Sequence, residues 1–184
     1  MKEVLEALEQ AIKRKIIVQL GRHELEEDDY FFHGFVMDYS ETFVLMQLVS
    51  DRFDLDGYEV LRTKDITFID SEFPERRFLE KALTAQGVRP TPLKGIDLSG
   101  ARPLFKSIEK QFPLLVIHRE WVSDDDCEVG RIKLAADEFY TLKNLSPTAR
   151  WVDDDKMYRY SDVTRVCFGG AYETTLALVA EIQV

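Results

Sequence analysis

Two segments of the chain place an arginine three residues before an aspartate, a spacing that can hold an anion or close a turn. They are Arg62 with Asp65 and Arg159 with Asp162. A guanidinium group matches the oxygens of a phosphate or a carboxylate. In a tight turn, however, the aspartate can accept hydrogen bonds from backbone amides while the arginine packs its stem along apolar neighbours. The sequence therefore leaves an anion-contact site and a structural corner as alternatives.

Aromatic residues accompany these segments. They could stack on bases or anchor a protein partner, and packing inside the protein is the alternative. The residues concerned are Tyr39, Trp121, Tyr140, Trp151, Tyr158 and Tyr160. We take Tyr39 and Tyr160, together with the two Arg–Asp pairs, as candidate ligand or partner contacts.

Acidic residues form short clusters in both halves of the chain. The candidates for an acidic rim are Glu26, Glu27, Asp28, Asp29, Asp124, Asp125, Asp126, Asp153, Asp154 and Asp155. In an up-and-down sheet, the loops that follow the first and the third strand lie on the same rim. The clusters fall in these loops, so we expect one negative rim in each half, with the arginine corner on the opposite rim.

A cation site is a second interpretation of one acidic turn. The segment Asp54-Leu-Asp56-Gly57 resembles a fragment of a calcium loop. The full pattern needs an oxygen ligand where Arg52 stands and a glutamate at the far end of the loop. We therefore predict no metal site and interpret the acidic turns as solvated charge.

Catalytic motifs are absent from the sequence. The histidines His23, His33 and His118 belong to no Ser/His/Asp or His-Glu-x-x-His arrangement. The segment Gly169-Gly170-Ala-Tyr172 has too few glycines for a phosphate-binding loop. We expect a protein that is not an enzyme and that uses no cofactor.

Composition excludes several classes of protein. The 184 residues are 45% hydrophobic, and 24 Lys and Arg stand against 34 Asp and Glu, a formal charge of −10. The hydrophobic fraction is large enough to form a core. The negative net charge repels phosphate backbones and anionic lipids. Apolar runs are too short for a membrane helix, the first residues do not form a signal peptide, and the two cysteines lack metal-type spacing. We expect a cytoplasmic protein.

The second half of the chain repeats the first faintly but in order. A shift of 96 positions places Gly34 on Gly130, and a shift of 97 places Arg62-Thr-Lys-Asp-Ile-Thr67 on Arg159-Tyr-Ser-Asp-Val-Thr164. Gly and Pro are frequent between the copies, as in a linker. We therefore expect domains at 1–86 and 104–184, joined by a linker at 87–103.

Each half is predicted to form a helix, five short strands and a trailing helical segment, because β-branched and aromatic runs alternate with Asp, Glu, Ser and Gly. The first half has helices to residue 13 and at 74–85, and strands at 16–20, 30–37, 43–49, 58–61 and 66–69. The second has a helix at 104–111, strands at 114–122, 127–134, 139–145, 156–160 and 163–168, and a helix early in 172–184. The fold class is mainly β with flanking helices.

This pattern resembles the Sm-like fold of the Sm, LSm and Hfq proteins. It shows a glycine in the second strand, Gly34 or Gly130, and an arginine where the fourth strand meets the fifth. The second motif of the family is similar to Leu61-Arg-Thr-Lys-Asp-Ile66 and to Tyr158-Arg-Tyr-Ser-Asp-Val163. The resemblance implies two tandem, five-stranded Sm-like or SH3-like small barrels.

The resemblance does not extend to the base pocket of RNA-binding members. That pocket uses an asparagine of the first motif, replaced here by Val44 and Tyr140, and an Arg-Gly pair, whose glycine is replaced by Thr63 and Tyr160. The resemblance therefore implies a scaffold rather than a uridine-type RNA site.

The leading hypothesis is a non-enzymatic interaction or scaffold protein whose acidic rims bind a basic protein partner. Self-association through strand edges is compatible with it. One alternative is RNA or single-stranded nucleic-acid binding through the rim of Arg62 and Arg159, which the net charge disfavours. An enzyme of unrecognised type is the other alternative.

Overall fold

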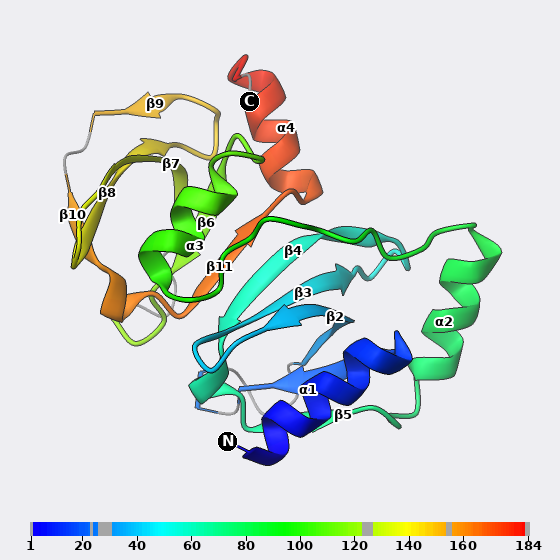
Figure 1. Ribbon diagram of the computed structural model, residues 1–184. Helices are drawn as coiled ribbons and strands as arrows, with labels where there is room; N and C mark the ends of the chain where they lie inside the picture. The colour runs from blue at the N-terminus through cyan, green and yellow to red at the C-terminus, as the bar shows by residue number, and fades with distance from the viewer. Residues whose placement is uncertain (1, 23, 26–30, 123–126, 154–155, 183–184) are drawn as a thin grey trace. The chain divides into compact units, whose positions relative to one another are not determined.

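The computed structural model describes residues 2–22, 24–25, 31–122, 127–153 and 156–182, and is mainly β with four helices (Figure 1). The chain divides into two compact units, Met1–Lys94 and Gly95–Val184. We call them the first and the second unit and describe each by itself.

The first unit contains a five-stranded antiparallel sheet and two helices. Its elements are α1 (Lys2–Arg14), β1 (Ile17–Gly21), β2 (Phe32–Tyr39), β3 (Phe43–Val49), β4 (Leu55–Arg62), the 3-10 turn η1 (Thr63–Asp65), β5 (Phe68–Asp70) and α2 (Arg76–Ala85). The strand order is β4-β3-β2-β1-β5. In the described residues of this unit, β5 pairs with β1 and not with β4, so the sheet is not closed.

The two faces of this sheet pack against different helices. Alternate residues of β1 to β4 pack against Leu8 and Ala11 of α1, whose apolar residues recur at helical spacing. The inner core comprises Leu8, Ala11, Val18, Leu20, Phe32, Val36, Val44, Met46, Leu61 and Ile66. On the other face, Leu79 and Leu83 of α2 pack with Phe35.

The second unit has the same succession of elements, with one additional strand. Its elements are α3 (Ala101–Ile108), β6 (Leu115–His118), β7 (Cys127–Ala135), β8 (Phe139–Leu145), β9 (Trp151–Val152), β10 (Met157–Arg159), the 3-10 turn η2 (Tyr160–Asp162), β11 (Arg165–Phe168) and α4 (Ala171–Val179). The order is β10-β8-β7-β6-β11, antiparallel throughout, and β9 also pairs with β8. Among the described strands of this unit, the sheet again stays open.

Aromatic residues fill much of the second unit's interior. Phe105 of α3 contacts Tyr140 edge to face, with ring centroids 4.9 Å apart. Tyr140 in turn stacks on Tyr158 at 5.3 Å. On the other side of the sheet, Leu176 and Ala177 of α4 join the cluster of Leu114, Val116, Val129 and Leu145.

The glycines singled out by the repeat occupy matching sites. Gly34 lies opposite Leu48, and Gly130 lies opposite Asn144. A Cβ atom on either glycine would collide with a carbonyl oxygen of the neighbouring strand, that of Gln47 or of Lys143. The close approach of the backbones therefore requires glycine at both positions.

The helices and most strands agree with the sequence predictions, including 43–49, 139–145 and the final helix. Three differences stand out. β9 was not predicted, and α3 begins at Ala101 rather than at 104. The strand expected at 114–122 ends at His118 because the chain turns there, with the Val122 amide donating to the Arg119 carbonyl. In the described part of the chain, no helix has the length and apolar character needed to cross a membrane.

Candidate functional site

The Arg62 corner of the first unit is a buried ion pair. The Arg62 Nε donates to Asp65 Oδ2 at 2.5 Å, and the two side chains are only 10% and 9% exposed. The turn η1 between them is anchored by Thr63, whose amide donates to the Thr42 carbonyl at 2.9 Å and whose hydroxyl donates to the Ser40 carbonyl at 3.0 Å. This corner therefore has the structural role that the sequence offered as one alternative.

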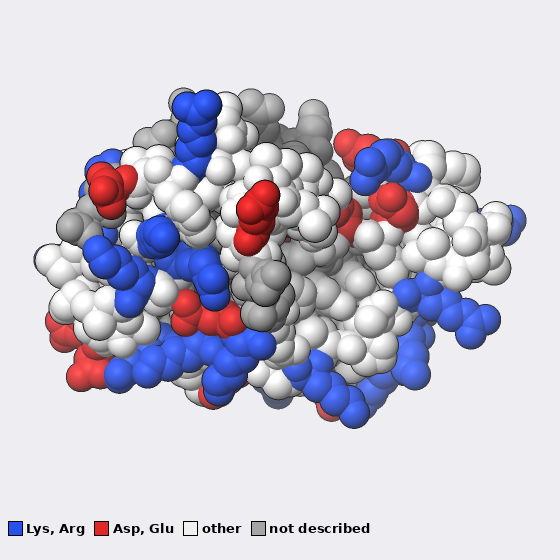
Figure 2. All heavy atoms as spheres, turned by 90° about the horizontal axis from the view of Figure 1, so that it is seen from above, with Lys and Arg blue, Asp and Glu red and all other residues white. Residues whose placement is uncertain are grey.

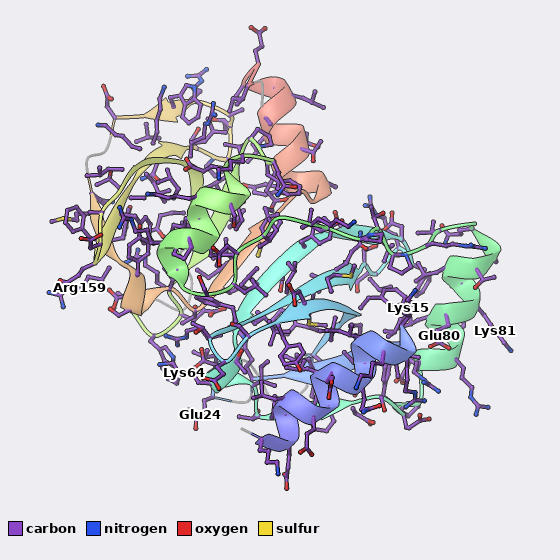
Figure 3. The ribbon with its side chains drawn as sticks, viewed as in Figure 1. Lys15, Glu24, Lys64, Glu80, Lys81 and Arg159 are labelled. Carbon is purple, nitrogen blue, oxygen red and sulfur yellow. The ribbon has the colours of Figure 1, made fainter. Side chains whose placement is uncertain are left out.

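The Arg159 corner of the second unit has the same backbone course but a different side-chain arrangement. The Tyr160 amide donates to the Glu138 carbonyl at 3.3 Å, which holds η2 against the turn between β7 and β8. Asp162 accepts a hydrogen bond from the Ser161 hydroxyl at 3.1 Å. The Arg159 side chain is exposed, makes no hydrogen bond or ion pair with any described residue, and points away from the ribbon (Figure 3). The structure therefore does not join Arg159 to Asp162.

A surface pocket of about 650 Å³ adjoins this second corner. It is lined by Asp137, Glu138, Phe139, Met157, Arg159, Tyr160 and Ser161. Arg102 forms an ion pair with Asp137, so Arg159 and Glu138 are the remaining charges of the lining. The pocket is thus close to neutral, which suits a polar or amphipathic group better than a polyanion.

The tyrosines differ in accessibility. Tyr140 and Tyr158 are buried and belong to the core, whereas Tyr160 is half-buried and lines the pocket. Burial raises the pKa of Tyr160, and the nearby Arg102 lowers it. Tyr39 is half-buried and packs against the inner core of the first unit. Of these four, Tyr160 alone lines a described pocket near a candidate arginine.

The arginine corner of the first unit also lies beside the end of β1. The Thr67 amide and hydroxyl donate to the Gly21 carbonyl at 3.1 and 3.3 Å. Glu24, which follows β1, and Lys64 of the corner lie on the same side of this unit (Figure 3). The acidic residues expected on the opposite rim, Glu26, Glu27, Asp28 and Asp29, lie outside the described residues, so their separation from the corner stays a prediction.

Most of the expected acidic rim lies outside the described residues, including Glu26, Glu27, Asp28, Asp29, Asp124, Asp125, Asp126, Asp154 and Asp155. Asp153 is described and exposed. Asp54 accepts a hydrogen bond from the Ser50 hydroxyl, and Arg52 lies 3.6 Å from its carboxylate. This turn therefore uses its acidic side chain to fix its own conformation. Within the described ranges, no group of three or more His, Cys, Asp or Glu side chains could hold a metal ion.

Two exposed Trp–Val pairs are functional candidates that the sequence reasoning did not connect. Trp121 and Val122 are 54% and 58% exposed, and Trp151 and Val152 are 37% and 43% exposed. Each pair leads directly into an acidic cluster: the sequence reads Trp-Val-Ser-Asp-Asp-Asp at 121–126 and Trp-Val-Asp-Asp-Asp at 151–155. The recurrence of a Trp-Val pair before three aspartates is the sequence pattern by which these pairs could have been identified.

Comparisons of the chain with protein-family models, curated proteins and solved structures found no match.

Proposed function

We propose that the protein is a non-enzymatic interaction or scaffold protein built from two Sm-like small barrels, whose acidic loops bind a basic protein partner. The barrel assignment is supported by the order of elements, because each unit has a helix, a meander of strands and a last strand that returns to the first. The glycines at the crowded strand crossings, Gly34 and Gly130, support it further.

The observation that carries the binding proposal is the pair of exposed tryptophans beside acidic clusters. Trp is enriched among the residues that dominate binding energy at protein interfaces. Its ring also attracts Lys and Arg side chains, as shown within this unit by Lys143, whose Nζ lies 4.3 Å from the centre of the Trp151 ring. A tryptophan followed by three aspartates therefore favours a partner rich in Lys and Arg.

Nucleic-acid binding at the arginine corners is the second candidate. One observation favours it, namely the exposed Arg159 beside the half-buried Tyr160. Arg62, in contrast, is committed to Asp65, and the Arg159 pocket includes Glu138. A polyanion would gain one guanidinium and meet a carboxylate, so we rank this candidate below the protein partner.

A titration with a basic peptide tests the proposal. The full chain is mixed with a peptide rich in Lys and Arg, and tryptophan fluorescence is followed because both tryptophans lie in the second unit. We expect binding that weakens with salt. We also expect it to be lost when Asp124, Asp125 and Asp126 are all changed to Asn, and weakened by Trp121→Ala.

The matched control changes Glu6 and Glu9 of α1, two exposed carboxylates, to Gln. Equal loss in the control and in the Asp variant would show a general charge effect and would contradict the proposal. Single-stranded RNA in place of the peptide, with Arg159→Ala as the variant, tests the second candidate. Light scattering measures self-association, for which β5 and β10, each with one strand neighbour among the described strands, offer edges.

A further inference from the structure

The outer face of the second unit's sheet carries exposed basic and apolar side chains. Arg131 of β7 lies directly opposite Lys143 of β8. One step along, Leu134 and Met157 flank Thr141 on either side. Side chains at the intervening positions, Leu142, Tyr140 and Tyr158, are buried in the core. The open face is therefore formed by Arg131, Leu134, Thr141, Lys143, Met157 and Arg159.

The open face combines apolar anchors with positive charge. Leu134 is 51% exposed and Met157 is 64% exposed. Arg131, Lys143 and Arg159 are exposed as well. In the space-filling view, Lys and Arg side chains lie on the left and along the lower edge, with acidic side chains among them (Figure 2). The composition of the open face differs from that of the chain as a whole, whose net charge is −10.

The corresponding face of the first unit is covered by an extended stretch of chain. Gln47 pairs with Phe35 in the register that Lys143 has with Arg131. The Thr91 amide donates to Gln47 Oε1 at 2.8 Å, and the Tyr58 hydroxyl donates to the Thr91 carbonyl at 3.1 Å. The stretch that contains Thr91 leaves α2 and runs along the sheet (Figure 1). Gln47 and Tyr58 are consequently buried, at 6% and 9% exposure.

No described residue of the second unit hydrogen-bonds to the Lys143 side chain as Thr91 does to Gln47. We propose that the open face binds an extended acidic segment of a partner protein, with apolar side chains of that segment seated on Leu134 and Met157 and its carboxylates paired with Arg131 and Lys143. The first unit supplies the precedent for an extended occupant, and charge complementarity makes it acidic.

The pairing of Arg131 with Lys143 supports an anionic occupant on energetic grounds. Like charges directly opposite each other on neighbouring strands are destabilising. Lys143 is partly compensated by the Trp151 ring, and Arg131 is partly compensated by the nearby Glu109 carboxylate, whose pKa it lowers. Carboxylates of a bound segment would remove the repulsion, so binding is expected to stabilise the second unit.

The test uses the full chain and two synthetic peptides. One peptide contains Glu with Leu and Phe anchors, and the other has Lys in place of each Glu. We expect binding of the acidic peptide to raise Tm and to weaken with salt, whereas any binding of the basic peptide at the acidic loops should be unaffected by Met157→Ser. Arg131→Glu should weaken binding of the acidic peptide about tenfold or more, and Met157→Ser should weaken it less.

Matched controls are Lys110→Glu, an exposed lysine after α3, and Leu178→Ser, an exposed apolar residue on α4. Both should bind the acidic peptide as the unmodified protein does. The proposal fails if the acidic peptide does not bind at low salt, or if the controls lose binding as much as Arg131→Glu. Circular dichroism verifies that each variant is folded. The basic-partner proposal is tested with a different peptide and different variants, so failure here leaves it standing.

Discussion

The corners that begin with Arg62 and Arg159 have nearly the same sequence and opposite properties. In the first unit the guanidinium is buried against Asp65, and the next residue, Thr63, ties the turn to Ser40 and Thr42. In the second unit, Tyr160 takes the place of Thr63, its ring packs toward Phe105, and Arg159 is left exposed. A repeated motif can therefore preserve a backbone turn while changing what its charged side chain does.

The largest difference between the corners should appear on removing each arginine. Arg62→Ala leaves Asp65 buried without its partner, which costs about 3–5 kcal/mol. Arg159→Ala removes an exposed side chain and should change the free energy of unfolding by less than about 0.5 kcal/mol. Urea unfolding measures both, with circular dichroism reporting the whole chain and tryptophan fluorescence reporting the second unit. Equal costs for the two variants would contradict the comparison.

Replacing the matching glycines, Gly34 and Gly130, should lower stability by a similar amount in the two units. Gly34→Ala and Gly130→Ala each push a Cβ against the carbonyl of the facing strand, and overpacking of this kind costs about 1–3 kcal/mol. The same urea experiment assigns the loss to one unit or the other, because only Gly130→Ala should shift the fluorescence transition. Gly87→Ala is an unsuitable control because of its positive φ; Ala85→Gly in α2 gives a milder loss of about 1 kcal/mol for comparison.

Tyr140 should lower the free energy of unfolding of the second unit, whereas Val44, its counterpart, has no such effect in the first unit. Its hydroxyl is buried and has no hydrogen-bond partner among the described residues. Tyr140→Phe should therefore raise the free energy of unfolding by about 1 kcal/mol. The control, Tyr158→Phe, should give no gain because that hydroxyl accepts from Asn144 at 3.5 Å. A loss of stability in Tyr140→Phe would show that the hydroxyl is satisfied.

The same tyrosine predicts alkaline sensitivity. Burial raises the pKa of Tyr140, with Glu128 raising it further and Arg119 lowering it. The unfolded chain loses the proton near pH 10, before the folded chain does. Stability is therefore fully present below about pH 10 and falls as the pH rises above it. The fluorescence transition of Tyr140→Phe should depend less steeply on pH in this range.

The smallest expected effect is a loss of stability of the first unit at acid pH, which the second unit should not share. His33 is half-buried, and burial lowers its pKa, opposed by Glu75 and Asp51. The unfolded state takes up the proton first, near pH 6.5, so the stabilisation is present above that pH and is lost as the pH falls. The second unit has Val129 at this position. His33→Val should reduce the acid dependence in circular dichroism and leave the fluorescence transition unchanged.

Local pattern accounts for most of the fold. Alternation and β-branched runs located β3 and β8 to the residue, because both strands are bounded by turn-forming sequences. It missed β9, since two residues are too few to establish a period. It also overextended β6, because the apolar residues Trp121 and Val122 follow the strand although the chain turns at Arg119. The spacing of apolar residues does not indicate where the chain turns back.

The sites were less accessible from the sequence. Arg62 and Arg159 each stand three residues before an aspartate, and the pattern alone does not separate a buried ion pair from an exposed cation. The open face could not be predicted from the sequence, because its residues come from three strands and a bulge between Ile132 and Leu134 shifts the register of β7 on β8. The Trp–Val pairs, in contrast, were visible in the sequence as a repeated string.

The return of each last strand to the first has a consequence for synthesis of the protein. The strands β1, β2 and β3 each pair with the next strand along the chain, but β1 receives its other neighbour only when Phe68 to Asp70 have been made. Until then the nascent chain presents an unpaired edge, which can pair with other chains. The second unit repeats this interval, because β6 waits for β11. A fragment that ends between β4 and β5 therefore leaves β1 with an unpaired edge, and one that ends between β10 and β11 leaves β6 with one.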